Sequence, residues 1–208
     1  MRKLTRRVLL FLALFLATPA FGGTILFLGD SLTAGLGVAE TEAYPALIEQ
    51  KVKEKNLPFT VINAGISGDT TAGGLARLDW VLQKKIDVLV LALGANDGLR
   101  GLPVAQTKAN LQAIFDRVKA KNPGVKIVIA GMQIPPNMGG EYGTAFRAIF
   151  PELARANQAA LVPFLLEGVG GNDGLNQVDH IHPTAAGHRV LAENVWRLLE
   201  PLLSKGGA

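Results

Sequence analysis

Residues 25–32 read Ile-Leu-Phe-Leu-Gly-Asp-Ser-Leu, so four large apolar side chains lead directly into a Gly-Asp-Ser turn. An apolar run without polar alternation is typical of a strand that is covered on both faces. Glycines at positions 35 and 37 indicate that the chain turns again a few residues later. The segment therefore predicts a buried strand that presents the hydroxyl of Ser31 at its carboxyl end.

The same pattern recurs along the chain, because short apolar runs alternate with longer stretches of helical periodicity. This alternation predicts a parallel sheet between layers of helices. Reactive side chains in such folds gather at the carboxyl ends of the strands. We expect strands at 24–28, 60–63, 88–93, 126–130 and 161–164, and helices at 43–55, 72–84, 104–121, 142–158 and 184–203.

The first 22 residues do not fit this pattern. Basic residues at positions 2, 3, 6 and 7 precede an unbroken apolar run at 8–17, and small residues follow at Ala20 and Gly22. This layout is typical of a secretory signal peptide, and the run is too short for a permanent membrane-spanning helix. We expect cleavage after Ala20 or Gly22, leaving a single domain over residues 23–208 that is periplasmic or secreted. An uncleaved N-terminal anchor is the alternative.

The charge balance and the absence of cysteine exclude several classes of function. The chain has 21 Lys and Arg against 17 Asp and Glu, but the leader holds four of the bases and no acid. The rest is balanced, so a basic surface for nucleic acid is not expected. No cysteine is present, which excludes disulfides and a thiolate nucleophile. We expect a monomer with no stable membrane span once the leader is removed.

A second polar block lies near the far end, where residues 179–188 read Asp-His-Ile-His-Pro-Thr-Ala-Ala-Gly-His. A spacing of three lets a short turn bring the Asp179 carboxylate to Nδ1 of His182. Nε2 then stays free to take the proton of a hydroxyl, such as that of Ser31. These three side chains are the minimum equipment for acyl transfer through a serine. We interpret His180 as a rim residue and His188 as structural or exposed.

A metal site is an alternative, since all three histidines fall within nine residues and His-x-His beside an aspartate can bind zinc. His180 and His188 would then have to converge on one ion from a turn and from inside a helix. No other cluster in the sequence supplies a fourth ligand. We therefore favour the serine arrangement and expect neither a metal nor a cofactor.

Acyl transfer also needs donors for the developing oxyanion. Gly68 follows the second expected strand and can bring its backbone N–H close, since it has no side chain. Asn96 follows the third, and its side-chain amide is a suitable second donor. Taken singly, each of these loops is more often a plain turn.

Together, Ser31, Gly68, Asn96 and His182 occur in an order and in contexts that resemble the SGNH hydrolase superfamily, the lipases and esterases with a Gly-Asp-Ser-Leu motif. Four ordered blocks are far more specific than any one of them. The resemblance spans nearly the whole chain after the leader. Its blocks are Gly29-Asp30-Ser31-Leu32, Ile66-Ser67-Gly68-Asp69, Gly94-Ala95-Asn96-Asp97 and Asp179-His180-Ile181-His182.

Segments 68–70, 74–78, 96–101 and 132–137 further resemble the exported bacterial multifunctional thioesterase/protease/lysophospholipase group. The resemblance implies a three-layer, flavodoxin-like α/β fold with a five-stranded parallel sheet. It also implies that Ser31 attacks, that His182 is the base and that Asp179 orients it. The N–H groups of Ser31 and Gly68 and the amide of Asn96 would form the oxyanion hole.

The implied substrates are arylesters, acyl thioesters and lysophospholipids. Two departures, His180 in place of a small residue and Ala95 in place of glycine, bear on substrate preference rather than on catalytic groups. Side chains in the loops are expected to wall an acyl groove, although each can equally well only cover the core. They are Leu99, Leu102, Ile134, Pro135, Met138 and Tyr142.

Two other functions stay open from the sequence. The same scaffold can serve a carbohydrate or peptidoglycan O-acetylesterase, although few aromatic residues are placed to stack on sugars. A non-catalytic flavodoxin-like module, binding an anion at residues 31–37, is possible in principle. This hypothesis leaves Asp179 and His182 without a role.

Overall fold

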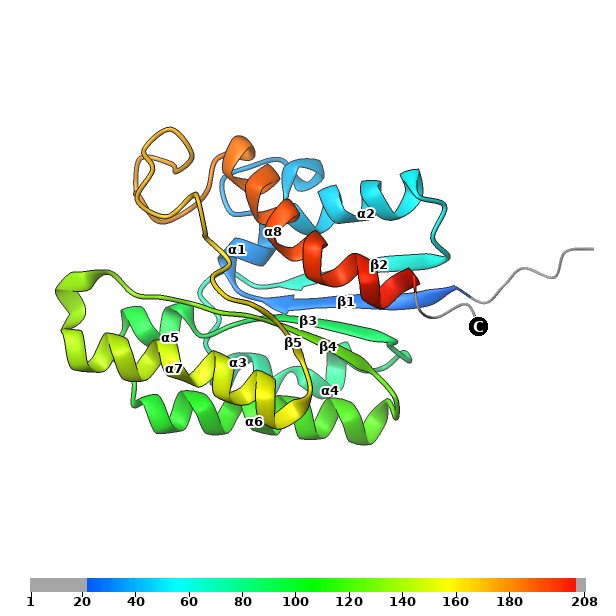
Figure 1. Ribbon diagram of the computed structural model, residues 1–208, viewed down its shortest axis with the longest axis horizontal. Coiled ribbons are helices and arrows are strands. Elements are labelled where there is room, and N and C mark those ends of the chain that lie inside the picture. Colours follow the sequence, from blue (N-terminus) through cyan, green and yellow to red (C-terminus); the bar gives the residue numbers. More distant parts are fainter. Residues whose placement is uncertain (1–21, 205–208) are drawn as a thin grey trace, which may run out of the picture.

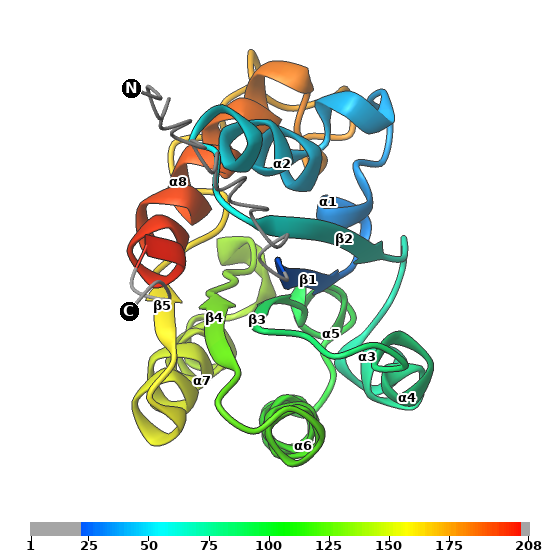
Figure 2. The ribbon, with the colours of Figure 1, turned by 90° about the vertical axis from the view of Figure 1, so that its right-hand side faces the viewer.

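The computed structural model describes residues 22–204, which form one parallel sheet between two layers of helices (Figures 1 and 2). The strands run in the order β2-β1-β3-β4-β5 and are all parallel. This is the flavodoxin-like order, and it confirms the predicted three-layer α/β fold. The strands are β1 (Gly23–Gly29), β2 (Phe59–Gly65), β3 (Val88–Ala92), β4 (Lys126–Ala130) and β5 (Ala160–Val162).

The helices divide between the two faces of the sheet (Figure 2). α2 (Tyr44–Glu54) and α8 (Ala185–Ser204) pack against each other on one face. The other face is covered by α3 (Thr71–Ala76), α4 (Leu78–Val81), α6 (Val104–Lys121) and α7 (Gly140–Asn157). Short helical turns complete the chain: α1 (Ser31–Ala34), η1 (Glu40–Glu42), α5 (Ala95–Leu99) and η2 (Pro136–Met138).

The core lies where the central strands meet the two helix layers. Every residue of β3 is buried, as are the last five residues of β1 and four of the five residues of β4. The expectation that all strands are covered on both faces is wrong for the two edge strands. β2 is only partly buried, and so are two of the three residues of β5.

Two predicted boundaries also differ from the structure. The helix expected over 72–84 is divided into α3 and α4 at Arg77. The Arg77 guanidinium there donates to the Asp69 carboxylate and to the Gly29 carbonyl, so contacts distant in sequence override the helical pattern. The last strand ends at Val162 instead of continuing to 164, because Pro163 has no N–H for the sheet.

The topology places all the loops after the strands at one edge of the sheet. In Figure 1 these loops lie at the left, whereas both ends of the described chain lie at the right. The five strands of this sheet and the helices that cover its two faces all lie within residues 22–204. In this segment no helix has the length and apolar character that crossing a membrane requires. The predicted leader, apart from Gly22, lies outside the described residues.

The turn that carries Ser31 can pack on β2 only because Gly65 has no side chain. Gly65 pairs with Gly29 in the sheet, and a Cβ at Gly65 would come 2.8 Å from the Ala34 Cα and closer still to the Ala34 nitrogen. These are backbone atoms, which cannot move without displacing α1.

We therefore expect Gly65→Ala to lower the free energy of unfolding by roughly 1–3 kcal/mol, in the range of overpacked sites. Urea titration followed by circular dichroism measures this change. Gly140→Ala is the matched control, since a Cβ at Gly140 meets nothing within 4 Å. Equal stability of the Gly65→Ala variant and the control would contradict the close-packing argument.

Candidate active site

Ser31 occupies the first position of α1, and only Asp30 separates it from β1, an interior strand of the sheet. Asp30 caps this turn, because its Oδ1 accepts the Leu32 backbone N–H at 3.0 Å. Gly35 ends the turn in the left-handed conformation, with φ of 78°. The Ser31 side chain is thereby held at the carboxyl edge of the sheet, with 8% of the residue exposed.

Asp30 is fully buried beside this serine, and its Oδ2 has no hydrogen-bond partner. Burial raises its pKa to about 7, and the hydrogen bond from Leu32 opposes this rise. The residue supports the turn, as expected.

His182 lies against Ser31, although 151 positions separate the two in sequence. The distance between His182 Nε2 and Ser31 Oγ is 2.9 Å, and that between His182 Nδ1 and Asp179 Oδ2 is 2.6 Å. An ionised carboxylate can only accept, so Nδ1 carries the proton and Nε2 accepts from the serine hydroxyl. The structure thus brings the three predicted side chains into one hydrogen-bonded chain.

The Asp179 carboxylate is fixed by three hydrogen bonds within its own turn. Besides the imidazole, it accepts the backbone N–H groups of Ile181 and His182, each at 3.0 Å. These bonds, led by that from the His182 side chain, hold the pKa of Asp179 well below its usual range. The carboxylate therefore stays ionised across the pH range in which histidine titrates.

Gln177 ties this turn to the loop after α1, a role that the sequence analysis missed. Its side-chain amide donates to the carbonyl oxygens of Leu36 at 2.7 Å and Pro183 at 2.9 Å. Its backbone N–H donates to the His182 carbonyl at 2.7 Å. A single glutamine thus joins the Ser31 side of the site to the His182 side.

The two predicted oxyanion donors lie in neighbouring loops at the same edge. Gly68 has φ of 81°, a conformation that favours glycine. Asn96 Nδ2 donates to the Asp69 carbonyl at 2.9 Å, next to Gly68. The amide nitrogen carries two hydrogens, so this bond leaves one free to donate.

Ion pairs and buried polar contacts hold these loops together. Arg77 Nε donates to Asp69 Oδ2 at 2.6 Å, and Arg77 Nη2 donates to the Gly29 carbonyl at 3.1 Å. The Gly68 loop is therefore anchored to the end of β1, two residues before Ser31. The buried Asp97 carboxylate similarly accepts the backbone N–H of Thr71 at 2.8 Å, joining α5 to α3. Sequence patterns contain no signal for such partners, which lie 8 to 48 residues apart.

The three histidines have separate surroundings. His180 is exposed at the rim, where its Nδ1 lies 3.0 Å from the Asp173 carboxylate. His188 is fully buried in α8, and its Nδ1 accepts the Tyr44 backbone N–H at 3.3 Å. Of the two options for His188, the structural one holds. The rings of His180, His182 and His188 thus turn to different partners, an arrangement that does not fit a shared metal ion.

Of the six residues predicted to wall an acyl groove, two are exposed, Leu99 and Pro135, and four are partly buried: Leu102, Ile134, Met138 and Tyr142. Tyr142 stacks on Phe146 and donates its hydroxyl to the Leu102 carbonyl at 2.7 Å. Tyr142 and Ile134 pack against the core and are partly buried, so they cover the core whether or not they also line a groove. Leu99 is 36% exposed, Pro135 is exposed and Met138 is partly buried.

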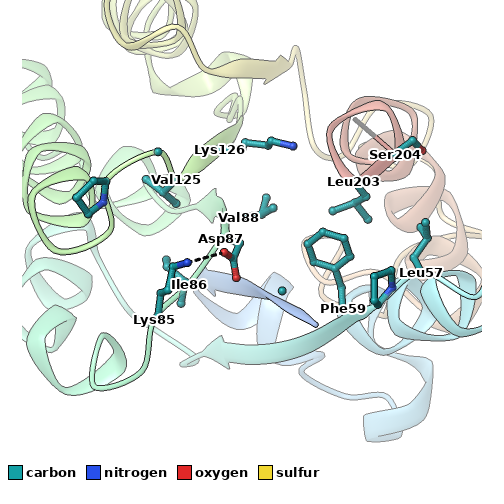
Figure 3. A pocket seen from close by; sticks show the side chains of 14 residues that line it. Leu57, Phe59, Lys85, Ile86, Asp87, Val88, Val125, Lys126, Leu203 and Ser204 are labelled. Atoms are coloured by element: carbon teal, nitrogen blue, oxygen red, sulfur yellow. Dashed lines mark ion pairs between the residues drawn. The ribbon is translucent and has the colours of Figure 1, made fainter. Parts of the chain in front are cut away.

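Two open hollows lie away from these side chains. One, of about 420 Å³, is lined by the amino ends of β1, β3 and β4 and by the end of α8 (Figure 3). Phe59, Val88 and Leu203 face it, with the ion-paired Lys85 and Asp87 at its edge. Another, of about 540 Å³, adjoins it. Neither contains Ser31 or any other predicted site residue.

Comparison with known proteins agrees with this geometry. The profile of the GDSL-like Lipase/Acylhydrolase family matches residues 27–190, from β1 to α8. The chain belongs to this family. The resemblance expected from the four sequence blocks is therefore confirmed.

Two relatives of this GDSL-family chain are similar over nearly their whole length. "Esterase TesA" of Pseudomonas aeruginosa is 44% identical, over 92% of this chain and 96% of its own. "Thioesterase 1/protease 1/lysophospholipase L1" of Escherichia coli is 39% identical, over 94% of this chain and 92% of its own.

A solved structure shows the same fold. It is that of the psychrotrophic esterase EstA from a Pseudoalteromonas species, inhibited by monoethylphosphonate. The TM-score is 0.82, with 32% identity, 88% coverage of this chain and 99% of the other.

The buried His188 makes stability depend on pH. Burial lowers its pKa from 6.5 to about 4, so between these values it binds a proton in the unfolded chain only. Its contribution to stability is therefore present above pH 6.5 and lost as the pH falls toward 4. At about 1.4 kcal/mol per pKa unit, the loss is roughly 3 kcal/mol.

We expect His188→Asn, which retains an acceptor for Tyr44, to lose less stability than the wild type between pH 6.5 and pH 4. Denaturant unfolding at several pH values measures the difference. The raised pKa of Asp30 has the opposite effect on stability between pH 3.8 and about 7. This effect is the same in both proteins, so it cancels in the comparison. An unchanged slope in the variant would remove His188 as the cause.

Proposed function

We propose that the protein is a serine hydrolase that cleaves carboxylic esters and acyl thioesters through an acyl-enzyme on Ser31. One observation carries the proposal: Ser31, His182 and Asp179 form a continuous hydrogen-bonded chain at the carboxyl edge of the sheet. The geometry matches nucleophile, base and orienting carboxylate.

In the first half of the reaction, Ser31 Oγ attacks the acyl carbonyl carbon and its proton passes to His182 Nε2. The imidazolium that forms is stabilised by the ionised Asp179. The oxyanion accepts hydrogen bonds from the backbone N–H groups of Ser31 and Gly68 and from the Asn96 amide. Collapse of this intermediate breaks the bond to the alcohol or thiol, which takes the proton from His182.

In the second half, a water molecule replaces the alcohol. His182 takes its proton, the hydroxide attacks the acyl carbon, and the carboxylic acid leaves as Ser31 regains its hydrogen. Water, base and nucleophile have to meet on one side of the acyl group. Asp179 is exposed and His182 is only partly buried, which supports access of water to this point.

The class of substrate is supported by the relatives. Their names describe an esterase and an enzyme with thioesterase and lysophospholipase activities. They favour acyl thioesters and lysophospholipid esters over sugar O-acetyl esters, and they disfavour a non-catalytic flavodoxin-like module. The loops with Leu99, Ile134 and Tyr142 are the proposed walls for the acyl chain.

We further propose that residues 1–22 are a signal peptide and that the enzyme acts in the periplasm or outside the cell. The basic head, the apolar run at 8–17 and the small residues at Ala20 and Gly22 support this location. N-terminal sequencing of the exported chain decides it: an intact Met1 on the mature protein would refute cleavage.

We expect Ser31→Ala and His182→Ala each to lower kcat on a p-nitrophenyl ester by about 10³-fold or more, since they remove nucleophile and base. Both variants should remain folded, since neither side chain belongs to the apolar core. Release of p-nitrophenol measures turnover, and circular dichroism checks the fold.

Matched controls are available for both residues. Ser67→Ala removes a neighbouring exposed serine, and His180→Ala removes the histidine two positions away. Both should retain activity within a few fold. Near-wild-type turnover by Ser31→Ala or His182→Ala would exclude that residue from the mechanism.

Asn96→Ala should lower kcat by about 10²–10³-fold while KM changes little, because the amide acts on the oxyanion rather than on the bound ester. Steady-state kinetics on the same ester separates kcat from KM. A change confined to KM would instead assign Asn96 to substrate binding.

A further inference from the structure

Exposed apolar side chains are concentrated at one edge of the molecule. Six large hydrophobic residues are exposed in the part of the chain that the structure describes, and one of them, Trp80, lies on α4. The other five belong to the segments after β1, β2 and β3 and to the loop that carries His182. We call this set the apolar rim: Leu36, Ile66, Leu99, Val178 and Ile181.

Hydrogen bonds connect the rim around Ser31. Gln177 donates to the Leu36 carbonyl, which places Leu36 beside the segment of Val178 and Ile181. On the other side, Ile66 donates its N–H to the Gly29 carbonyl at 3.1 Å, next to the Ser31 turn. Arg100, which follows Leu99, donates to the Gly68 carbonyl at 2.9 Å. The rim therefore borders the nucleophile from both sides.

Val178 shows that packing inside the protein does not account for the apolar side chains of the rim. It is 97% exposed, so it has almost no contact with the rest of the protein. Its loop is nevertheless held in place, since the residues before and after it are hydrogen-bonded through Gln177 and Asp179. A valine side chain that is exposed to water gains no burial on folding, whereas apolar side chains gathered on one exposed edge mark a candidate interaction site.

Charges on the rim segments restrict the partner. Within residues 35–42, 66–69, 99–102 and 172–182, Arg100 is the single arginine and no lysine occurs. The acidic residues there are Glu40, Glu42, Asp69, Asp173 and Asp179. Arg77 neutralises Asp69 from outside these segments. The other acidic residues still outnumber Arg100, so such an edge disfavours an anionic surface and accepts an uncharged or zwitterionic one.

We propose that the apolar rim seats the enzyme on aggregates of uncharged or zwitterionic lipid, so that an acyl ester passes to Ser31 directly from the lipid phase. This rests on the proposed function, because a hydrolase of long acyl esters meets its substrate mainly in aggregates. Docking through the rim keeps the acyl chain in apolar surroundings while the ester enters the site.

Binding is tested separately from catalysis, in the Ser31→Ala background without residues 1–21. Vesicles are made of phosphatidylcholine, alone or mixed with phosphatidylglycerol, and bound protein is measured by co-sedimentation. We expect the additional changes Leu36→Ser and Val178→Ser together to weaken binding to phosphatidylcholine by about tenfold or more. Trp80→Ser, at the exposed residue outside the rim, is the matched control and should bind normally.

Several results would overturn the proposal. They are no binding to phosphatidylcholine vesicles, an equal loss in the Trp80→Ser control, stronger binding as phosphatidylglycerol is added, and self-association of the protein that the rim changes abolish. The last would make a second copy the partner.

Comparing activity on a dissolved ester with activity on a micellar ester separates docking on lipid from binding of substrate. With Ser31 restored, the rim variant should keep its kcat/KM on a dissolved short-chain ester and lose about tenfold on a lysophosphatidylcholine micelle. Equal losses on both would mean that the rim only contacts substrate, which overturns docking. If the wild type hydrolyses neither ester but still binds vesicles through the rim, the proposed function fails and rim docking stands.

Discussion

The hydrogen bond between Ser31 and His182 depends on the sheet, on the packing of the helices and on the loops that carry these two residues. Ser31 follows a central strand of the sheet, and His182 precedes the helix that packs beside α2. Parallel strands end at one edge, so loops distant in sequence meet there. Gln177 then joins the two sides, because its amide donates to the carbonyl groups of Leu36 and Pro183.

Some of the residues that hold the site in place have buried polar atoms without a hydrogen-bond partner, and such atoms lower the stability of the fold. Asp30 Oδ2, Arg77 Nη1 and His188 Nε2 are buried without a hydrogen-bond partner. Unpaired groups of this kind typically cost about 1–3 kcal/mol each. Asp30 and Arg77 contact the Ser31 turn and the end of β1. The extensive apolar core offsets these costs, so stability elsewhere permits a polar site at the edge of the sheet.

Sequence patterns predicted some features of this site and missed others for identifiable reasons. Asp179 and His182 are three residues apart, so local geometry alone indicated their contact. Ser31 was predicted as their partner from its place after a strand and from the family resemblance. Gln177 and Arg77 gave no signal, because their partners are backbone carbonyl groups, which any residue supplies, and for Arg77 also a carboxylate eight positions away. The helix break at Arg77 was missed for the same reason.

The sequence by itself determined the alternation of strands and helices, the family, and the identity of the polar residues at the strand ends. These follow from local periodicity and from short motifs. Only the tertiary structure decided that β2 is a partly exposed edge, that His188 is buried, and that five separate apolar residues form one rim around Ser31. Such features depend on which segments become neighbours, and burial or exposure of a side chain is a property of those neighbours rather than of the residue.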